Sequence, residues 1–210
     1  GNGIVDDSMV IGKYNKTPVA DIYTNIQMAI ETLQNQVDCF WSSDGLEKAQ
    51  SFPLGSFIKA YIREHPSPLF KYEYNFDSTL SSNKMPNVTF SPRALTKVFD
   101  NIISNACNHG FEDQESKGNI VKIEVGTEND TPIINISNNG KPFHKKLTNE
   151  DVFTYGRSSK TSQSHFGIGG YEVRFLMREQ NGEAEFFSEP EAEFPVKYRL
   201  SFMNTNNVEH

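Results

Sequence analysis

The stretch SPRALTKVFDNIISNACNHG, residues 91–110, decides the fold because it carries a clearly marked helix with a polar face inside it. Ser91 and Pro92 are typical of a helix start, where a serine side chain caps free N–H groups and proline takes the first helical position. Apolar residues then recur every three or four positions and predict a helix that runs to about Gly110. These residues are Leu95, Val98, Phe99, Ile102, Ile103 and Ala106.

Asn101 and Asn105 interrupt this apolar helix four residues apart, so their side chains project from one face as neighbours. Asparagine is a poor helix former, and a buried carboxamide has to be hydrogen-bonded. The pair therefore indicates either a ligand site or a structural hydrogen-bond network.

Segments on both sides of this helix predict a mixed fold. Residues 120–126 and 131–137 alternate apolar and polar side chains around Glu128-Asn129-Asp130, which predicts a hairpin. The other predicted elements are strands at 69–76, 88–90, 183–188 and 196–203, and a helix at 171–180 that Asn181-Gly182 ends. Helices combined with antiparallel strands in this order favour an α+β two-layer sandwich, with helices on one face of the sheet.

Residues 1–66 are predicted to form an N-terminal helical segment. Apolar residues recur at helical spacing from Pro18 to about Phe40, and a second short helix covers residues 53–62. The apolar stripe of the first helix needs a partner, which is either a second copy of the chain in a homodimer or the domain itself. Residues 67–204 then form the main domain, and residues 205–210 form a tail.

The composition is that of a soluble globular protein, with 36% hydrophobic and 22% charged residues among 210. A net charge of -7 and a pI near 5.3 leave no basic footprint for binding nucleic acid. Cys39 and Cys107 have no CxxC spacing, so neither a disulfide framework nor a zinc site is indicated, and a cytoplasmic location is expected. No apolar run reaches the roughly 18 residues of a membrane span, so membrane contact would come only through segments outside this sequence.

Two later segments carry further polar and glycine-rich signals. The strand at 131–137 runs into Asn138-Asn139-Gly140, where a carboxamide can hydrogen-bond a planar base, although such a sequence is more often only a turn. Residues 156–161 form a basic, hydroxyl-rich loop, and residues 166–170, FGIGG, open a helix. Glycines at a helix N-terminus let backbone N–H groups approach a phosphate, although most glycine-rich stretches are only flexible loops.

Taken in order, these segments resemble the ATP-binding domain of the GHKL superfamily, and most closely the catalytic domain of sensor histidine kinases. The order is an asparagine helix, a strand ending in Asn-Asn-Gly, a turn with Val152-Phe153, a Ser/Thr-rich loop and a glycine-opened helix before two final strands. The resemblance covers about Val88 to Phe202. It implies the Bergerat ATP-binding fold, with ATP and Mg²⁺ as ligands.

The resemblance also implies roles for individual residues. Asn105 would be a Mg²⁺ ligand, Asn101 would contribute to the phosphate and metal region, and Asn138 would accept a hydrogen bond from the adenine amino group, where the family commonly has an aspartate. Residues 156–166 would form a mobile lid, from which Lys160 or Arg157 could reach the γ-phosphate. The other implied nucleotide-binding residues are His109, Gly140, Phe153, Ser158, Ser159, Thr161, Gly167, Ile168 and Gly169. The implied catalytic set is Asn101, Asn105 and Lys160.

The same resemblance favours a kinase over a hydrolase. In GHKL hydrolases such as the gyrase B subunit, a glutamate one turn before the metal-binding asparagine activates water. Asn101 stands at that position and cannot take a proton. Asp100 is the neighbouring carboxylate, but it points about 100° away on the helix and is interpreted as a solvated residue. The expected function is therefore transfer of the γ-phosphate of ATP to a histidine in two-component signalling, with a response regulator as partner.

The histidine that would accept the phosphate is not evident. Residues 16–22 faintly resemble the end of the kinase H box, but Lys13 stands five residues before Pro18, where the family has its phosphorylated histidine. The acceptor would then lie upstream or on another protein. The alternative is a non-catalytic or slow-ATPase nucleotide-binding module that signals through its N-terminal helices.

Overall fold

The computed structural model describes residues 23–24, 26–27, 29–30, 48–76, 86–111, 118–143, 148–154 and 168–203. The chain divides into two compact units, Gly1–Leu46 and Glu47–His210. The described residues of the first unit are helical and lie within the helix predicted from Pro18 to Phe40, whose other residues are outside the described ranges. The second unit contains all the elements that follow.

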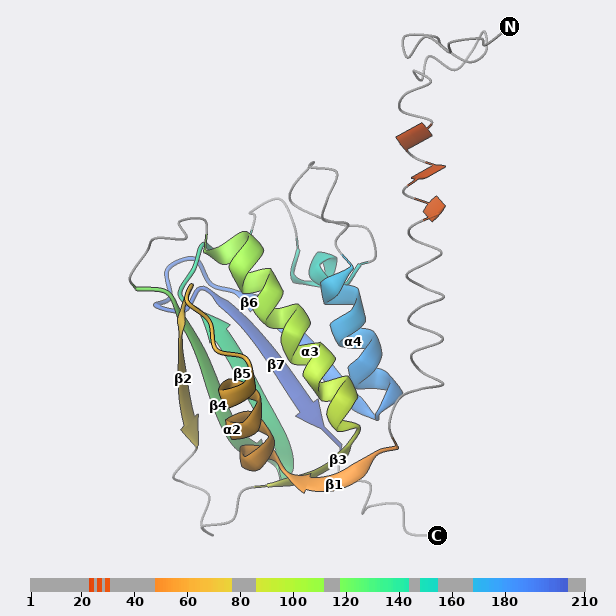
Figure 1. Ribbon diagram of the computed structural model, residues 1–210, viewed down its shortest axis with the longest axis vertical. Helices are drawn as coiled ribbons and strands as arrows, with labels where there is room; N and C mark the ends of the chain where they lie inside the picture. The colour runs from red at the N-terminus through yellow and green to blue at the C-terminus, as the bar shows by residue number, and fades with distance from the viewer. Residues whose placement is uncertain are drawn as a thin grey trace, which may run out of the picture. The chain divides into compact units, whose positions relative to one another are not determined.

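A five-stranded sheet with the order β2-β4-β5-β7-β6 forms one layer of the second unit (Figure 1). The strands are β2 (Lys71–Phe76), β4 (Ile120–Glu128), β5 (Thr131–Asn138), β6 (Gly182–Ser188) and β7 (Val196–Phe202). Neighbouring strands are antiparallel except β2 and β4, which run parallel. The strand predicted at 69–76 is confirmed, but its side chains are mostly exposed because β2 lies at the sheet edge.

Three helices, α2 (Leu54–Glu64), α3 (Pro92–Asn105) and α4 (Gly169–Glu179), form the second layer on one face of the sheet (Figure 1). Buried side chains alternate along β4 and β5, as expected for strands with one face against helices. The largest fully buried side chains come from both layers; they include Leu54, Ile58, Leu95, Phe99, Ile123, Ile134, Ile136, Leu176 and Leu200. This arrangement confirms the predicted α+β two-layer sandwich.

Local signals in the sequence fix where several elements begin and end. The Ser91 side chain accepts a hydrogen bond from the Ala94 N–H at 3.2 Å, which makes it the N-cap of α3. Asn129 and Asp130, between β4 and β5, have φ values of 48° and 62°, as a tight hairpin turn with two left-handed residues requires. Asn181, two residues after the end of α4, has a φ of 56°, the left-handed conformation that often ends a helix.

The last turn of the asparagine helix is wider than an α-helical turn. Directly after α3, residues Ala106–Gly110 form a π-helical turn, η1, and the Phe111 N–H donates to the Ala106 carbonyl at 2.9 Å. The predicted helix end near Gly110 is therefore confirmed, although the final residues leave α-helical geometry.

The short helix predicted at 53–62 is present as α2 and packs on α3. The Tyr61 and Phe99 rings meet edge to face with their centroids 4.9 Å apart, and the centroids of Phe57 and Phe99 are 5.6 Å apart. A separate two-stranded sheet pairs β1 (Gln50–Pro53), which comes directly before α2, with β3 (Asn87–Phe90), which comes directly before α3. The structure groups α2 with the second unit, whereas the sequence interpretation placed it with the N-terminal segment.

Candidate functional site

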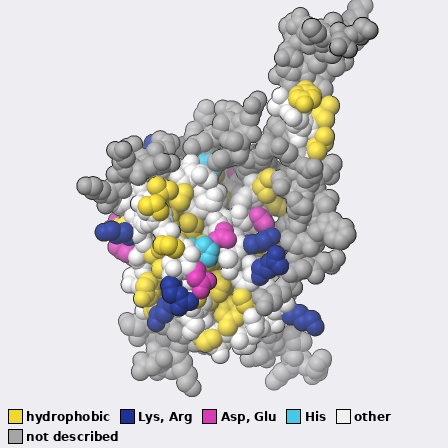
Figure 2. Space-filling model, in the orientation of Figure 1, with side chains coloured by type: hydrophobic (Ala, Val, Ile, Leu, Met, Phe, Trp, Pro, Cys, Tyr) yellow, Lys and Arg dark blue, Asp and Glu magenta, His cyan; other side chains and the backbone are white. Residues whose placement is uncertain are grey.

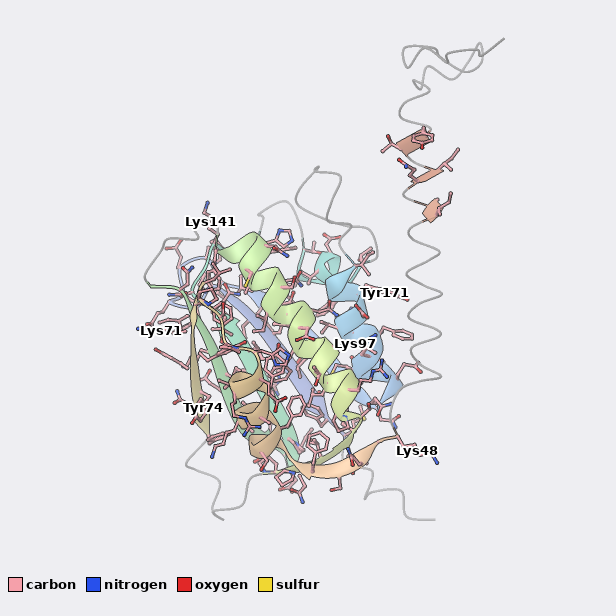
Figure 3. The ribbon with its side chains drawn as sticks, in the orientation of Figure 1. Lys48, Lys71, Tyr74, Lys97, Lys141 and Tyr171 are labelled. Carbon is pink, nitrogen blue, oxygen red and sulfur yellow. The ribbon has the colours of Figure 1, made fainter. Side chains whose placement is uncertain are left out.

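Asn101 lies on the side of α3 that faces α4, and its side chain is tied to that helix. Its Nδ2 group donates to Glu172 Oε2 at 2.9 Å. Lys97, one turn earlier on α3, places its Nζ 4.0 Å from Glu172 Oε1. Figure 3 labels Lys97 where α3 and α4 run side by side. A basic and an acidic side chain therefore accompany this asparagine.

Asn105, one turn further along α3, is tied to the sheet instead. Its Nδ2 group donates to the hydroxyl of Tyr198 on β7 at 3.1 Å. Tyr198 is buried, with its ring edge to face against Phe186 at 4.9 Å. Burial raises the pKa of Tyr198, while the hydrogen bond with Asn105 lowers it by a smaller amount. The hydroxyl is therefore neutral at physiological pH and able to hold the amide.

The oxygens of both carboxamides come together at the N-terminus of α4. A side-chain carbon placed on Gly169 would lie 3.4 Å from Asn101 Oδ1 and 3.5 Å from Asn105 Oδ1. Because Gly169 has no such carbon, both oxygens remain uncovered by its side chain. Amide oxygens are hard ligands of the kind that Mg²⁺ accepts, so the donor set fits a divalent cation. Asn101 and Asn105, predicted to be neighbours, thus form one cluster with Gly169.

A second cluster lies where β5 meets the end of η1. Asn138 is buried, and its Oδ1 accepts the Gly140 N–H at 3.0 Å. A side-chain carbon on Gly140 would lie only 2.7 Å from backbone atoms of Gly110, so this contact requires glycine. His109 precedes Gly110 in η1 and is half-buried. The oxygen predicted to accept from adenine therefore already accepts one backbone hydrogen bond, which leaves a second lone pair for a ligand.

Phe153 belongs to a short 3₁₀ helix, η2 (Asn149–Phe153), that packs against α4. The guanidinium carbon of Arg174 lies 3.8 Å from the centroid of the Phe153 ring, and the guanidinium donates two hydrogen bonds to the Glu150 carboxylate. The bond from Arg174 lowers the pKa of Glu150. Phe153 also contacts Tyr198 edge to face at 6.3 Å, which connects η2 with the partner of Asn105.

Gly170 brings η2 and α4 into direct backbone contact. A side-chain carbon on Gly170 would lie 2.0 Å from the Val152 carbonyl oxygen. Ile168, just before α4, is half-buried and serves as its N-cap without a side-chain hydrogen bond. Of the two adjacent glycines in the FGIGG segment, Gly170 is therefore required for packing, whereas Gly169, the one predicted to bind nucleotide, faces the two asparagines.

The remaining predicted residues lie outside the described parts of the chain. They are Arg157, Ser158, Ser159, Lys160, Thr161 and Gly167. Their assignment to the nucleotide stays a prediction, as does that of the lid at residues 156–166.

Asp100 points toward α2 and not toward the asparagines. Its Oδ1 accepts from the Tyr61 hydroxyl at 2.8 Å and lies 3.8 Å from Nε2 of His65. Burial, followed by this hydrogen bond, raises the pKa of Tyr61. The carboxylate is half-exposed, as expected for a solvated residue, but it also links α3 to α2.

Sequence reasoning missed Glu172 and Tyr198, which hold the two asparagines. Tyr198 falls in a strand with alternating burial, so its inward position was accessible from the pattern of residues 196–203. Glu172 is the acidic residue in the first turn of α4. No local signal connects either residue to α3, since the partners are 71 and 93 positions apart in the chain.

Within the described ranges, charged and metal-binding groups form no second candidate site on the face shown in Figure 2. The helix-bearing face carries Lys and Arg side chains in small separate groups among acidic and apolar ones (Figure 2). Among the residues whose positions the structure gives, no three His, Cys, Asp or Glu side chains gather as metal ligands. In the same ranges, no helix has the length and apolar character to cross a membrane.

Comparisons with known proteins agree with this geometry. The model of the family described as histidine kinase-, DNA gyrase B-, and HSP90-like ATPase matches residues 90–202. No curated protein matches the chain significantly.

Solved structures of histidine kinases share the fold. The catalytic domain of histidine kinase ThkA is 18% identical with a TM-score of 0.56, over 74% of this chain and 95% of that one. The mycobacterial sensor histidine kinase MprB is 14% identical with a TM-score of 0.56, over 73% and 96%. Histidine kinase AdeS of Acinetobacter baumannii is 14% identical with a TM-score of 0.57, over 90% and 87%.

The family model spans the part of the chain that carries the candidate site. The matched region covers more than half of the chain and includes α3, α4 and the end of β5, which together carry both clusters. The chain therefore belongs to the histidine kinase-, DNA gyrase B- and HSP90-like ATPase family, and it has the fold of histidine kinase catalytic domains.

Proposed function

We propose that this chain is the ATP-binding catalytic domain of a two-component sensor histidine kinase. It would transfer the γ-phosphate of ATP to a histidine that is not evident in this sequence. The observation that carries the proposal is the convergence of the Asn101 and Asn105 oxygens on Gly169 at the N-terminus of α4. Membership of the ATPase family and the kinase-like fold support it.

Each cluster would bind one part of the nucleotide. Asn105, with Asn101 beside it, would hold Mg²⁺, which when bound neutralises charge on the phosphates. Asn138 would accept from the adenine amino group with its second lone pair. The backbone N–H groups at the start of α4 would face the phosphates, where the helix dipole favours negative charge.

The loop before α4 supplies the remaining proposed contacts, by resemblance to the family. Lys160 would reach the γ-phosphate and Arg157 could do the same. Ser158, Ser159 and Thr161 would donate hydroxyl hydrogen bonds to phosphate oxygens. Gly167 would let the backbone approach them closely.

Phosphotransfer is favoured over hydrolysis because, among the described residues around Asn101, no carboxylate is available as a base. Asn101 occupies the position of the hydrolase glutamate and cannot take a proton. Glu172 is the carboxylate beside it, but its two oxygens face Asn101 and Lys97. A kinase needs less from such a group, since positioning and charge neutralisation supply most of its catalysis.

The second candidate function is a nucleotide-binding module without phosphotransfer. The observation that favours it is Lys13 in the position of the family's acceptor histidine. Such a module would signal through its N-terminal helices, with dimerisation through the stripe from Val19 to Phe40. In either function the domain would lie in the cytoplasm, and a response regulator would be the partner of the kinase.

Two measurements test the proposal. Calorimetry with Mg²⁺ and a non-hydrolysable ATP analogue should show binding to the wild type and at least about tenfold weaker binding to Asn105→Ala. Incubation with γ-labelled ATP, alone and with response regulators and histidine-containing acceptor proteins, should then give labelled protein. Binding without any label would favour the second function, and no binding of any adenylate at millimolar concentration would refute both.

A further inference from the structure

We propose that Glu172 is a positioning residue that fixes the orientation of the Asn101 carboxamide, so that the Asn101 oxygen joins that of Asn105 in holding a divalent cation. The proposal rests on the function proposed above. It assigns a role in Mg²⁺-dependent nucleotide binding to a carboxylate on α4 that does not itself touch the nucleotide.

The orientation follows from what each group can donate or accept. A carboxamide has an oxygen that accepts and an NH₂ group that donates, and rotation by half a turn exchanges the two. An ionised carboxylate only accepts, so Asn101 must direct its NH₂ group toward Glu172, 2.9 Å away. The Asn101 oxygen then faces the other way, and there it lies beside Gly169 together with the Asn105 oxygen.

Asn105 is held less strictly than Asn101. Its partner is the Tyr198 hydroxyl, which can either donate or accept. The opposite orientation of Asn105 would therefore also form a hydrogen bond. Of the two partners, only Glu172 excludes the orientation that would place an NH₂ group, which cannot bind a cation, at the shared point.

The surroundings allow a carboxylate next to a triphosphate site. Glu172 is in the first turn of α4, where the helix dipole favours negative charge. Lys97 lies 4.0 Å from Oε1 and offsets the charge that would otherwise repel phosphates. Both side chains are only partly exposed, with relative accessibilities of 35% for Lys97 and 24% for Glu172, so screening by water is incomplete.

Replacement of Glu172 by glutamine tests the role directly. Glutamine has the same shape, but its own amide can donate to the Asn101 oxygen and so permits the reversed orientation. The matched control is Glu179→Gln, which removes the same charge from an exposed position on the same helix. Calorimetry would measure the affinity for a non-hydrolysable ATP analogue in Mg²⁺ and in EDTA, and the ratio of the two is the readout.

Glu172→Gln should lower this ratio about tenfold, as expected for loss of a group that orients a metal ligand, whereas Glu179→Gln should leave it unchanged. In an Asn101→Ala background, Glu172→Gln should have no further effect on the ratio. A merely structural role would weaken binding equally in both buffers. If thermal unfolding shows that the glutamine variant is unstable, Glu172→Leu provides an apolar replacement that also leaves the Asn101 NH₂ group without its acceptor.

The outcomes separate the two proposals. An unchanged Mg²⁺ ratio in Glu172→Gln, with normal nucleotide binding by the wild type, would overturn the role of Glu172 alone. A wild type that binds no adenylate in either buffer would overturn the proposed function, and the role of Glu172 with it.

Discussion

Single alanine substitutions of the two adjacent glycines at the start of α4 should affect different properties: Gly170→Ala should lower stability, and Gly169→Ala should weaken nucleotide binding. In Gly170→Ala the new methyl group would lie 2.0 Å from the Val152 carbonyl oxygen, where an ordinary contact needs about 3.5 Å. Since the obstacle is backbone, η2 and α4 must separate by more than about 1 Å.

The cost can be worked out from the groups that this separation displaces. Overpacking of a tight contact costs about 1–3 kcal/mol. Weakening the stacking of Arg174 on Phe153, now at 3.8 Å, adds up to about 1 kcal/mol. Alanine regains up to about 1 kcal/mol through its higher helix propensity. The net expectation for Gly170→Ala is a loss of about 2 kcal/mol in the free energy of unfolding.

Gly169→Ala is the matched comparison. Its methyl group would meet Asn101 Oδ1 at 3.4 Å and Asn105 Oδ1 at 3.5 Å, which are ordinary van der Waals contacts. The unfolding free energy should change by less than about 0.5 kcal/mol. The methyl group would, however, cover both oxygens, so the affinity for nucleotide with Mg²⁺ should fall about tenfold.

Urea unfolding and calorimetry on the two variants give the four numbers needed. Equal m values would show that the unfolding transitions can be compared. The contact of Gly170 with Val152 is refuted if Gly170→Ala is as stable as the wild type. The convergence of oxygens on Gly169 is refuted if Gly169→Ala binds Mg²⁺ and nucleotide normally.

Three further predictions concern groups around the two clusters. Tyr198→Phe removes the hydroxyl that holds Asn105 and should lower the unfolding free energy by about 1 kcal/mol in urea titration; no change would show that this bond contributes nothing. Arg174 lowers the pKa of the mostly exposed Glu150 in the folded protein. Above the unfolded pKa of about 4.3, their ion pair should therefore make the wild type about 0.5 kcal/mol more stable than Glu150→Gln. This difference in stability should disappear as the pH falls through the lowered pKa of folded Glu150. A stability difference that persists at pH 2 would show that it does not come from the Arg174–Glu150 ion pair. Asn138→Asp should increase the preference for ATP over ITP, which lacks the amino group, because a charged acceptor binds a donor more strongly; an unchanged ratio in competition binding would place adenine elsewhere.

Much of the fold could be predicted because its signals are local. Ser91-Pro92 predicted the start of α3, and the Ser91 side chain caps it. The turn at Asn129 and Asp130 was predictable because asparagine and aspartate tolerate positive φ. The pairing of β1 with β3 was not predicted, since Gln50–Pro53 has no alternating pattern and its partner begins at Asn87. Strand order and the parallel pairing of β2 with β4 are likewise properties of distant segments.

The candidate site divides in the same way. The spacing of Asn101 and Asn105 placed both on one face, and the structure places that face next to Gly169. Their partners Glu172 and Tyr198 come from another helix and another strand, so no periodicity in α3 could indicate them. The packing role of Gly170 was also hidden, because a glycine required by a neighbouring carbonyl is identical in sequence to one that approaches a phosphate.

The π-helical turn at Ala106–Gly110 has a consequence for how relatives should be aligned. Such a turn is equivalent to one extra residue inserted into an α-helix, so the residues beyond it are rotated relative to a continuous helix. Counting by threes and fours from Asn105 therefore assigns His109 to the wrong angular position. A relative with an uninterrupted α-helix would match this chain up to Asn105 and would be displaced by one residue afterwards. Deleting a single residue between 106 and 110 should return this turn to α-helical geometry and rotate the following residues about the helix axis.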